Sequence, residues 1–95
     1  MIKETQVFIS KFAEKQIKKL PKQISEALFI WVESSELTGI ADIRNLKGYH
    51  DEPLKGDRKG QRSARLNRSY RVIYIENENK DLVLITVIEV NKHEY

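Results

Sequence analysis

The spacing of apolar residues changes from a helical period to a strand period at a glycine-containing loop, residues 48–60. Before the loop, apolar and small residues recur three or four positions apart, at Ile24, Leu28, Trp31 and Ser35. After the loop, polar and apolar residues alternate over 61–66 and 70–76. The first pattern indicates an amphipathic helix and the second a pair of strands, so the chain is restricted to an α+β fold.

The segments on either side of this helix predict the neighbouring elements. Residues 6–9 are typical of a short strand, and Ser10 is suited to cap a first helix. Pro21 ends that helix and fits the first turn of the second, which closes at Gly39. Residues 40–46 allow one or two further helical turns.

Residues 82–90 are apolar at both odd and even positions, which indicates a strand inside the sheet. Such a strand is covered on both faces, or it faces a groove that a partner fills. Asn67 and Arg68 predict a tight turn between the two preceding strands. We therefore expect an N-terminal strand and two helices packed on an antiparallel sheet. The helices cover one face, and the other face is left for Arg65 and Arg71.

The composition excludes several classes of protein. Ninety-five residues suffice for one domain, 1–95. Cysteine is absent, so we expect no disulfide, no thiolate nucleophile and a cytoplasmic location. Residues 1–6 lack the apolar core of a signal peptide, and the longest apolar run, 27–32, is too short to span a membrane. His50 and His93 form no ligand cluster, so we expect no metal and no other cofactor.

Positive charge is concentrated in one stretch of the chain. Residues 55–71 hold seven Lys or Arg against one acid, a net charge of +6, while the whole chain carries +3. A local cationic patch is typical of a surface that binds a polyphosphate such as RNA. Five candidate RNA-binding residues belong to it: Lys55, Lys59, Arg62, Arg65 and Arg68. Four lysines of the first helix form either a solvated face or a second phosphate contact: Lys11, Lys15, Lys18 and Lys19.

Residues in and near this patch have the chemistry that metal-independent RNA cleavage requires. The 2′-hydroxyl attacks the adjacent phosphorus when a base takes its proton, cations stabilise the phosphoryl oxygens and an acid protonates the leaving 5′-oxygen. Glu52 is the candidate base and His93 the candidate acid. Arg71, with Arg65, is the candidate phosphate clamp. The products are a cyclic phosphate and a free 5′-hydroxyl.

Each of these residues also has a purely structural interpretation. Arg71 pairs across the sheet, Glu52 is a solvated loop acid, and His93 belongs to a frayed terminus. Tyr95 is a stacking residue or part of the same frayed end. Trp31 lies on the apolar stripe and is therefore assigned to the core. The cleavage hypothesis requires that Glu52, Arg71 and His93 meet on one sheet face.

Three segments, 53–56, 65–74 and 90–95, carry a resemblance to a known family. They read Pro-Leu-Lys-Gly, Arg-Leu-Asn-Arg-Ser-Tyr-Arg-Val-Ile-Tyr and Val-Asn-Lys-His-Glu-Tyr. In them the chain resembles the RelE/ParE superfamily of toxin–antitoxin toxins, and within it the HigB-like and RelE/StbE-type mRNA interferases. The resemblance implies a RelE-like, microbial-RNase-type fold, cleavage of mRNA in the ribosomal A site and neutralisation by a cognate antitoxin protein.

The same resemblance implies roles for single residues. Glu52 matches the catalytic glutamate of the YoeB branch, and Arg71 matches the strand arginine that the interferases share. His93 falls where the family has a C-terminal histidine or arginine. Tyr95 is similar to the closing tyrosine of YoeB and is counted with the catalytic group. The five basic residues match only as members of a surface that meets ribosomal and messenger RNA.

Two other functions stay open. A ParE-like toxin has the same fold but poisons DNA gyrase by binding, without ribonuclease chemistry. An inactive basic module that binds RNA needs no acid–base residues. We expect a ribosome-dependent mRNA endonuclease, because Glu52, Arg71 and His93 are what a ribonuclease needs and a gyrase poison does not.

Overall fold

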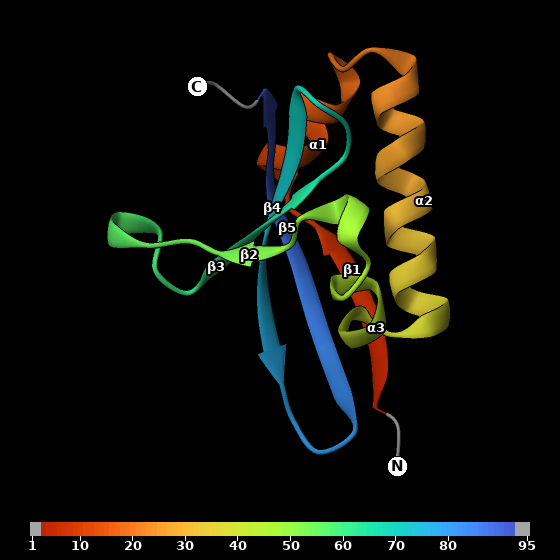
Figure 1. Ribbon diagram of the computed structural model, residues 1–95, viewed down its shortest axis with the longest axis vertical. Helices are drawn as coiled ribbons and strands as arrows, with labels where there is room; N and C mark the ends of the chain where they lie inside the picture. The colour runs from red at the N-terminus through yellow and green to blue at the C-terminus, as the bar shows by residue number, and fades with distance from the viewer. Residues whose placement is uncertain (1–2, 93–95) are drawn as a thin grey trace.

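This computed structural model describes residues 3–92. A five-stranded sheet lies at the centre of the fold (Figure 1). The strands are β1 (Glu4–Ile9), β2 (Glu52–Pro53), β3 (Gln61–Arg65), β4 (Tyr70–Glu78) and β5 (Leu82–Lys92). Their order across the sheet is β1-β5-β4-β3-β2. Helices from the N-terminal half pack on one face of this sheet, which confirms the predicted α+β class.

Local sequence signals set the ends of the helices. The helices are α1 (Lys11–Lys18), α2 (Lys22–Thr38) and α3 (Ile40–Arg44), with short 3-10 turns η1 (Lys47–Tyr49) and η2 (Gly56–Arg58). The Ser10 hydroxyl accepts a hydrogen bond from the Ala13 N–H at 3.1 Å, as predicted for the cap of α1. Gly39 separates α2 from α3 and has a φ of 100°. Glycine suits this position because any residue with a side chain would be strained in that conformation.

The sheet is antiparallel from β2 to β5, as predicted, but β1 pairs with β5 in parallel. A parallel pair requires a long crossover between its two strands, and the helices and β2–β4 supply it here. The partner of β1 depends on this tertiary connection rather than on the residues of β1. Sequence patterns therefore did not predict the parallel pair.

The connection between β3 and β4 spans residues 66–69 instead of the predicted two-residue tight turn. The side-chain Oδ1 of Asn67 accepts hydrogen bonds from the N–H groups of Ser69 and Tyr70, both at 2.8 Å. In such an Asx turn the asparagine side chain replaces a backbone acceptor, so it holds a longer loop than the Asn-Arg dipeptide alone indicates.

The face of the sheet toward the helices forms the core. Trp31 of α2 is fully buried against Tyr74 of β4, with ring centroids 5.3 Å apart, which confirms its assignment to the core. Strand β5 lies between β1 and β4, as predicted for an interior strand. Its residues Val83, Ile85 and Val87 are buried toward the helices. The alternate residues of β5 are only half-buried on the other face of the sheet.

The face of the sheet away from the helices is called the outer face here. Residues that pair directly across antiparallel strands point to the same face. Arg65 pairs with Arg71, and Glu52 pairs with Ser63, so all four lie on the outer face. The hairpin that joins β2 to β3 projects to the side of the molecule away from α2 (Figure 1). Within residues 3–92, no helix has the length and apolar character needed to cross a membrane.

Candidate active site

A pocket of about 190 Å³ opens on the outer face at the ends of β2, β3 and β4. Its lining includes six residues that bear chemistry: His50, Glu52, Ser63, Arg65, Arg68 and Arg71. Glu52, Arg65 and Arg71 are three of the four residues that the sequence hypothesis brings together. At roughly 30 Å³ per water molecule, the volume corresponds to about six waters, enough for a phosphodiester group and its nearest atoms.

Arg65 and Arg71 face each other directly across the β3–β4 ladder. Residues in such a pair have Cβ atoms roughly 5 Å apart, and like charges at that separation repel. Neither guanidinium forms an ion pair with a residue of the described range. The Nε of Arg71 is buried and has no hydrogen-bond partner among these residues. The pair therefore presents several donors and two charges to whatever enters the pocket.

Glu52 enters the pocket from the opposite edge. It belongs to the two-residue strand β2, pairs with Ser63 and is solvent-exposed. Its carboxylate forms no ion pair with the residues that the structure describes. With Arg65, Arg68 and Arg71 counted against Glu52, the pocket has a net charge of +2 when His50 is neutral. An anionic ligand is favoured there, and one carboxylate remains available for proton transfer.

The other predicted RNA-binding residues divide into three groups. Arg68, in the β3–β4 connection, is exposed and lines the pocket. Lys55 and Lys59 are exposed in the β2–β3 hairpin and do not line it. Arg62 lies on the helix side of β3, because it pairs with Tyr74. The structure therefore does not bring Arg62 to the outer face with the other basic residues.

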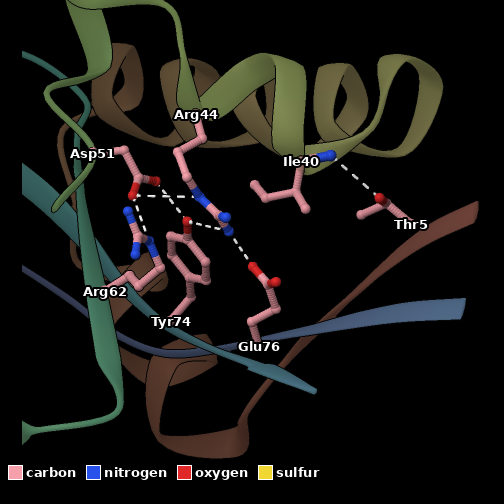
Figure 2. A network of polar contacts seen from close by, with 7 residues as sticks. All are labelled: Thr5, Ile40, Arg44, Asp51, Arg62, Tyr74 and Glu76. Atoms are coloured by element: carbon pink, nitrogen blue, oxygen red, sulfur yellow. Dashed lines mark hydrogen bonds and ion pairs between the residues drawn. The ribbon is translucent and has the colours of Figure 1, made fainter. Parts of the chain in front are cut away.

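Arg62 is instead part of a polar network beneath the pocket, centred on Asp51 (Figure 2). The Asp51 carboxylate accepts hydrogen bonds from Arg62 Nε at 2.7 Å and from the Tyr74 hydroxyl at 2.5 Å. Arg44 Nε lies 3.7 Å from the same carboxylate, within ion-pair distance. The Asp51 side chain is only 1% exposed, so these partners compensate a buried charge. No sequence pattern indicated this network, because its members come from several separate segments of the chain.

Burial and polar contacts together shift the pKa values of two groups in this network. Burial, followed by the hydrogen bond to the Asp51 carboxylate, raises the pKa of the Tyr74 hydroxyl far above its usual value. Burial alone lowers the pKa of Arg44, but its contacts with Tyr74 and Glu76 outweigh that effect and the pKa is raised. The Arg44 guanidinium also donates a hydrogen bond to the Glu76 carboxylate. The Tyr74 hydroxyl therefore keeps its proton at physiological pH and donates it to the Asp51 carboxylate in a hydrogen bond.

Two predicted catalytic residues, His93 and Tyr95, lie outside the described residues. The last described residue, Lys92, pairs with Tyr70, which lines the pocket, and Asn91 pairs with Arg71. Strand β5 therefore runs to the end of the sheet where the pocket opens.

His50 is a titratable residue of the pocket that was not among the predicted site residues. It lines the pocket together with Glu52, which follows it by two positions in the chain. Its place in the pocket depends on the left-handed backbone at this position, which residue spacing does not reveal. Among the described residues, no group of three His, Cys, Asp or Glu side chains is arranged to hold a metal ion.

Comparison with known proteins reveals a likeness of fold. No protein-family model matches the sequence, and no curated protein matches it. A YoeB/ParE toxin structure from Agrobacterium tumefaciens is 17% identical, with 94% of this chain and 99% of that chain covered and a TM-score of 0.71. The heterotetrameric YoeB–YefM toxin–antitoxin complex from Staphylococcus aureus is 20% identical, with 97% and 99% covered and a TM-score of 0.66.

The archaeal RelE–RelB complex from Pyrococcus horikoshii is 24% identical, with 93% of each chain covered and a TM-score of 0.66. These likenesses extend over nearly the whole chain, whereas the sequences themselves have diverged. The expected RelE-like fold is confirmed, and the resemblance to the RelE/ParE toxins that the sequence motifs indicate holds for the fold as a whole.

Proposed function

We propose that this chain is the toxin of a type II toxin–antitoxin pair and acts as a ribosome-dependent mRNA endonuclease. The observation that carries the proposal is the opposed pair Arg65 and Arg71, which lines a pocket without an ion pair to any described residue. A phosphodiester placed between two guanidinium groups relieves their repulsion and matches their fork geometry. The fold shared with toxin structures supports the same proposal.

In the proposed reaction, Glu52 accepts the proton of the RNA 2′-hydroxyl. The 2′-oxygen then bonds to phosphorus, and Arg71 with Arg65 stabilises the charge on the phosphoryl oxygens. His93 protonates the leaving 5′-oxygen, and Tyr95 contributes to the same end of the site. The products are a cyclic phosphate and a 5′-hydroxyl, and no metal or other cofactor takes part.

The proposed partners are the mRNA in the ribosomal A site, ribosomal RNA and a cognate antitoxin. Arg68 at the pocket rim and Lys55 and Lys59 in the hairpin extend the cationic surface toward RNA. Two structures with this fold are complexes, one with YefM and one with RelB, which supports an antitoxin partner for this chain. We propose that the antitoxin covers the Arg65–Arg71 pocket and that both proteins act in the cytoplasm. Its binding is then salt-sensitive and competes with RNA.

The test is expression of the chain followed by mapping of mRNA 5′ ends. We expect cuts at defined positions within translated codons, and a loss of about 100-fold or more for Arg71→Ala. Lys80→Ala is the matched control, because Lys80 is exposed in the β4–β5 connection and does not line the pocket. DNA breaks that depend on gyrase, together with intact mRNA, support the ParE-like alternative. A growth arrest that Arg71→Ala leaves unchanged contradicts the nuclease proposal.

A further inference from the structure

We propose that His50 is a second general base of the pocket, which takes the 2′-hydroxyl proton of RNA in parallel with Glu52. This role depends on the proposed ribonuclease function and adds an acid–base residue to it. His50 is the one imidazole within residues 3–92, and it lines the pocket together with Glu52, Arg65 and Arg71.

The backbone of His50 has an unusual conformation. Its φ of 43° and ψ of 46° are left-handed, and among the described residues it is the one non-glycine residue with positive φ. For a residue with a Cβ this conformation costs about 1 kcal/mol, and glycine or asparagine ordinarily takes such a position. Strained residues of this kind are more frequent at functional sites, where placing a particular side chain compensates for the free-energy cost of the backbone conformation.

The buried Asp51 fixes the direction of its neighbours. Its carboxylate is held on the helix side of the sheet by Arg62 and Tyr74. Successive residues of an extended segment point to opposite sides, so the anchoring of Asp51 turns Glu52 toward the outer face. The left-handed turn at His50 leaves its side chain lining that same pocket. The Asp51 network on the helix side of the sheet thus supports two proton-accepting groups on the outer face, His50 and Glu52.

Because His50 and Glu52 line the same pocket and are close in the chain, the proposal places both on the side of the attacking 2′-oxygen. In an in-line displacement the attacking and leaving oxygens lie on opposite sides of phosphorus. The Cα atoms of residues two positions apart lie at most about 7 Å from each other, and both side chains line the pocket, so in the proposal both approach the same hydroxyl. An imidazole nitrogen accepts the 2′-hydroxyl proton, the 2′-oxygen bonds to phosphorus and the bond from phosphorus to the 5′-oxygen breaks. The leaving oxygen takes its proton from the acid proposed above, His93.

The other charged or titratable groups of the pocket are Glu52 of β2, Arg65 of β3, Arg68 of the β3–β4 connection, and Tyr70 and Arg71 of β4. Imidazole changes its charge between about pH 5 and 8, a range in which arginine and tyrosine do not ordinarily titrate. The decisive observation is the cleavage rate of a variant that lacks the Glu52 carboxylate. If this rate rises through that pH range only when His50 is present, the imidazole acts as a base.

The experiment compares Glu52→Gln, His50→Asn and the double variant in ribosome-dependent RNA cleavage from about pH 5 to pH 9. Asparagine tolerates the left-handed conformation, so His50→Asn removes the titrating group without breaking the turn. We expect Glu52→Gln to keep a residual rate that increases between about pH 5 and 8. In the double variant that rate falls about 100-fold further and the pH-dependent rise disappears. Thermal unfolding of each variant checks that the fold is retained.

A double variant that cleaves as fast as Glu52→Gln overturns the role of His50, and so does a Glu52→Gln variant with no residual cleavage. RNA with sulfur in place of the 5′-oxygen separates base from acid, because a thiolate leaves without protonation. The further loss of rate from Glu52→Gln to the double variant persists on this substrate if His50 is a base, and its disappearance overturns that role. Wild-type protein that cleaves no RNA rejects the proposed function itself, which distinguishes the two failures.

Discussion

Arg71 meets opposite demands from function and from stability. Directly across the ladder stands Arg65, a like charge, and the buried Nε of Arg71 has no hydrogen-bond partner among the described residues. Both features cost free energy in the absence of ligand. A phosphodiester supplies the missing acceptor and the missing negative charge at once. Under the proposed function, the site is therefore arranged for the bound state, and its free-energy cost appears in the free protein.

Replacing Arg71 by methionine is expected to stabilise the free protein while abolishing cleavage. Methionine keeps the length of the side chain but removes the charge repulsion and the buried donor, so the free energy of unfolding rises by about 1 kcal/mol. Urea denaturation measures this change. Lys92→Met is the control, since Lys92 is exposed on β5, and its effect stays within about 0.5 kcal/mol. A clear loss of stability in Arg71→Met contradicts the argument.

Tyr74 makes stability depend on pH in the alkaline range. Burial and the Asp51 carboxylate raise its pKa in the folded protein above the unfolded value, which lies near pH 10. The unfolded state then releases its proton first, so this contribution to stability is complete below about pH 10 and declines as pH rises above it. Tyr74→Phe should remove that part of the decline. The measurement is the free energy of unfolding of the wild type and of Tyr74→Phe between about pH 8 and 11, and equal slopes for the two proteins would contradict the argument.

At the scale of elements, the short segment 50–52 connects the core to the pocket. Strand β2 has only two residues, and its pairing with β3 alone would fix it weakly. Asp51 adds the anchor, through its contacts with Arg62, Tyr74 and Arg44. The edge of the pocket that carries Glu52 is thus held by a buried ion network rather than by a long strand.

Asp51→Asn tests this anchor. The substitution leaves Arg62 and Arg44 without their shared buried anion, and breaking such a group costs about 3 kcal/mol. Chemical denaturation measures the loss, and the RNA-cleavage rate falls with it at temperatures where the variant is still folded, because Glu52 and His50 lose their support. Asp57→Asn is the matched control, since Asp57 is exposed in η2. Equal stability of the two variants would show that Asp51 anchors nothing.

The sequence was informative about elements and much less so about their side-chain partners. Periodicity, a serine cap and a glycine were sufficient to predict the helices and the strands β3, β4 and β5, because these signals are local. Arg62 was assigned to the RNA surface on charge alone, but one position of register turns it to the helix face. The anion that holds Arg62, Asp51, lies in a different loop. Such pairings depend on tertiary contacts, and neither composition nor spacing records them.

At the scale of the whole molecule, the distribution of charge matters more than its sum. Residues 55–71 carry +6, so the remainder of the chain carries −3 and the total of +3 conceals a strong asymmetry. The structure divides this basic stretch further, because Arg62 and Arg58 are in ion pairs while Arg65, Arg68 and Arg71 line the pocket. Binding of a polyanion is therefore expected to depend on the pocket arginines rather than on the stretch as a whole.

Salt dependence of RNA binding distinguishes these two groups of arginines. Each phosphate contact on a single strand contributes about −0.7 to the slope of log K against log salt concentration. Arg68→Gln, at the exposed rim, should therefore make the slope shallower by about 0.7 for any RNA sequence. Arg62→Gln should leave the slope unchanged, because the Arg62 charge is already compensated by Asp51 on the other face.

Fluorescence anisotropy with an RNA methylated at its 2′-oxygens measures binding without cleavage, and Lys80→Gln controls for loss of net charge. An equal change of slope in the Arg62 and Arg68 variants would mean that the whole basic stretch meets RNA, as charge alone predicts. Different slopes would mean that only some arginines of the basic stretch contact RNA. The strand register would then determine which ones do, because it sets the face of the sheet on which each arginine lies.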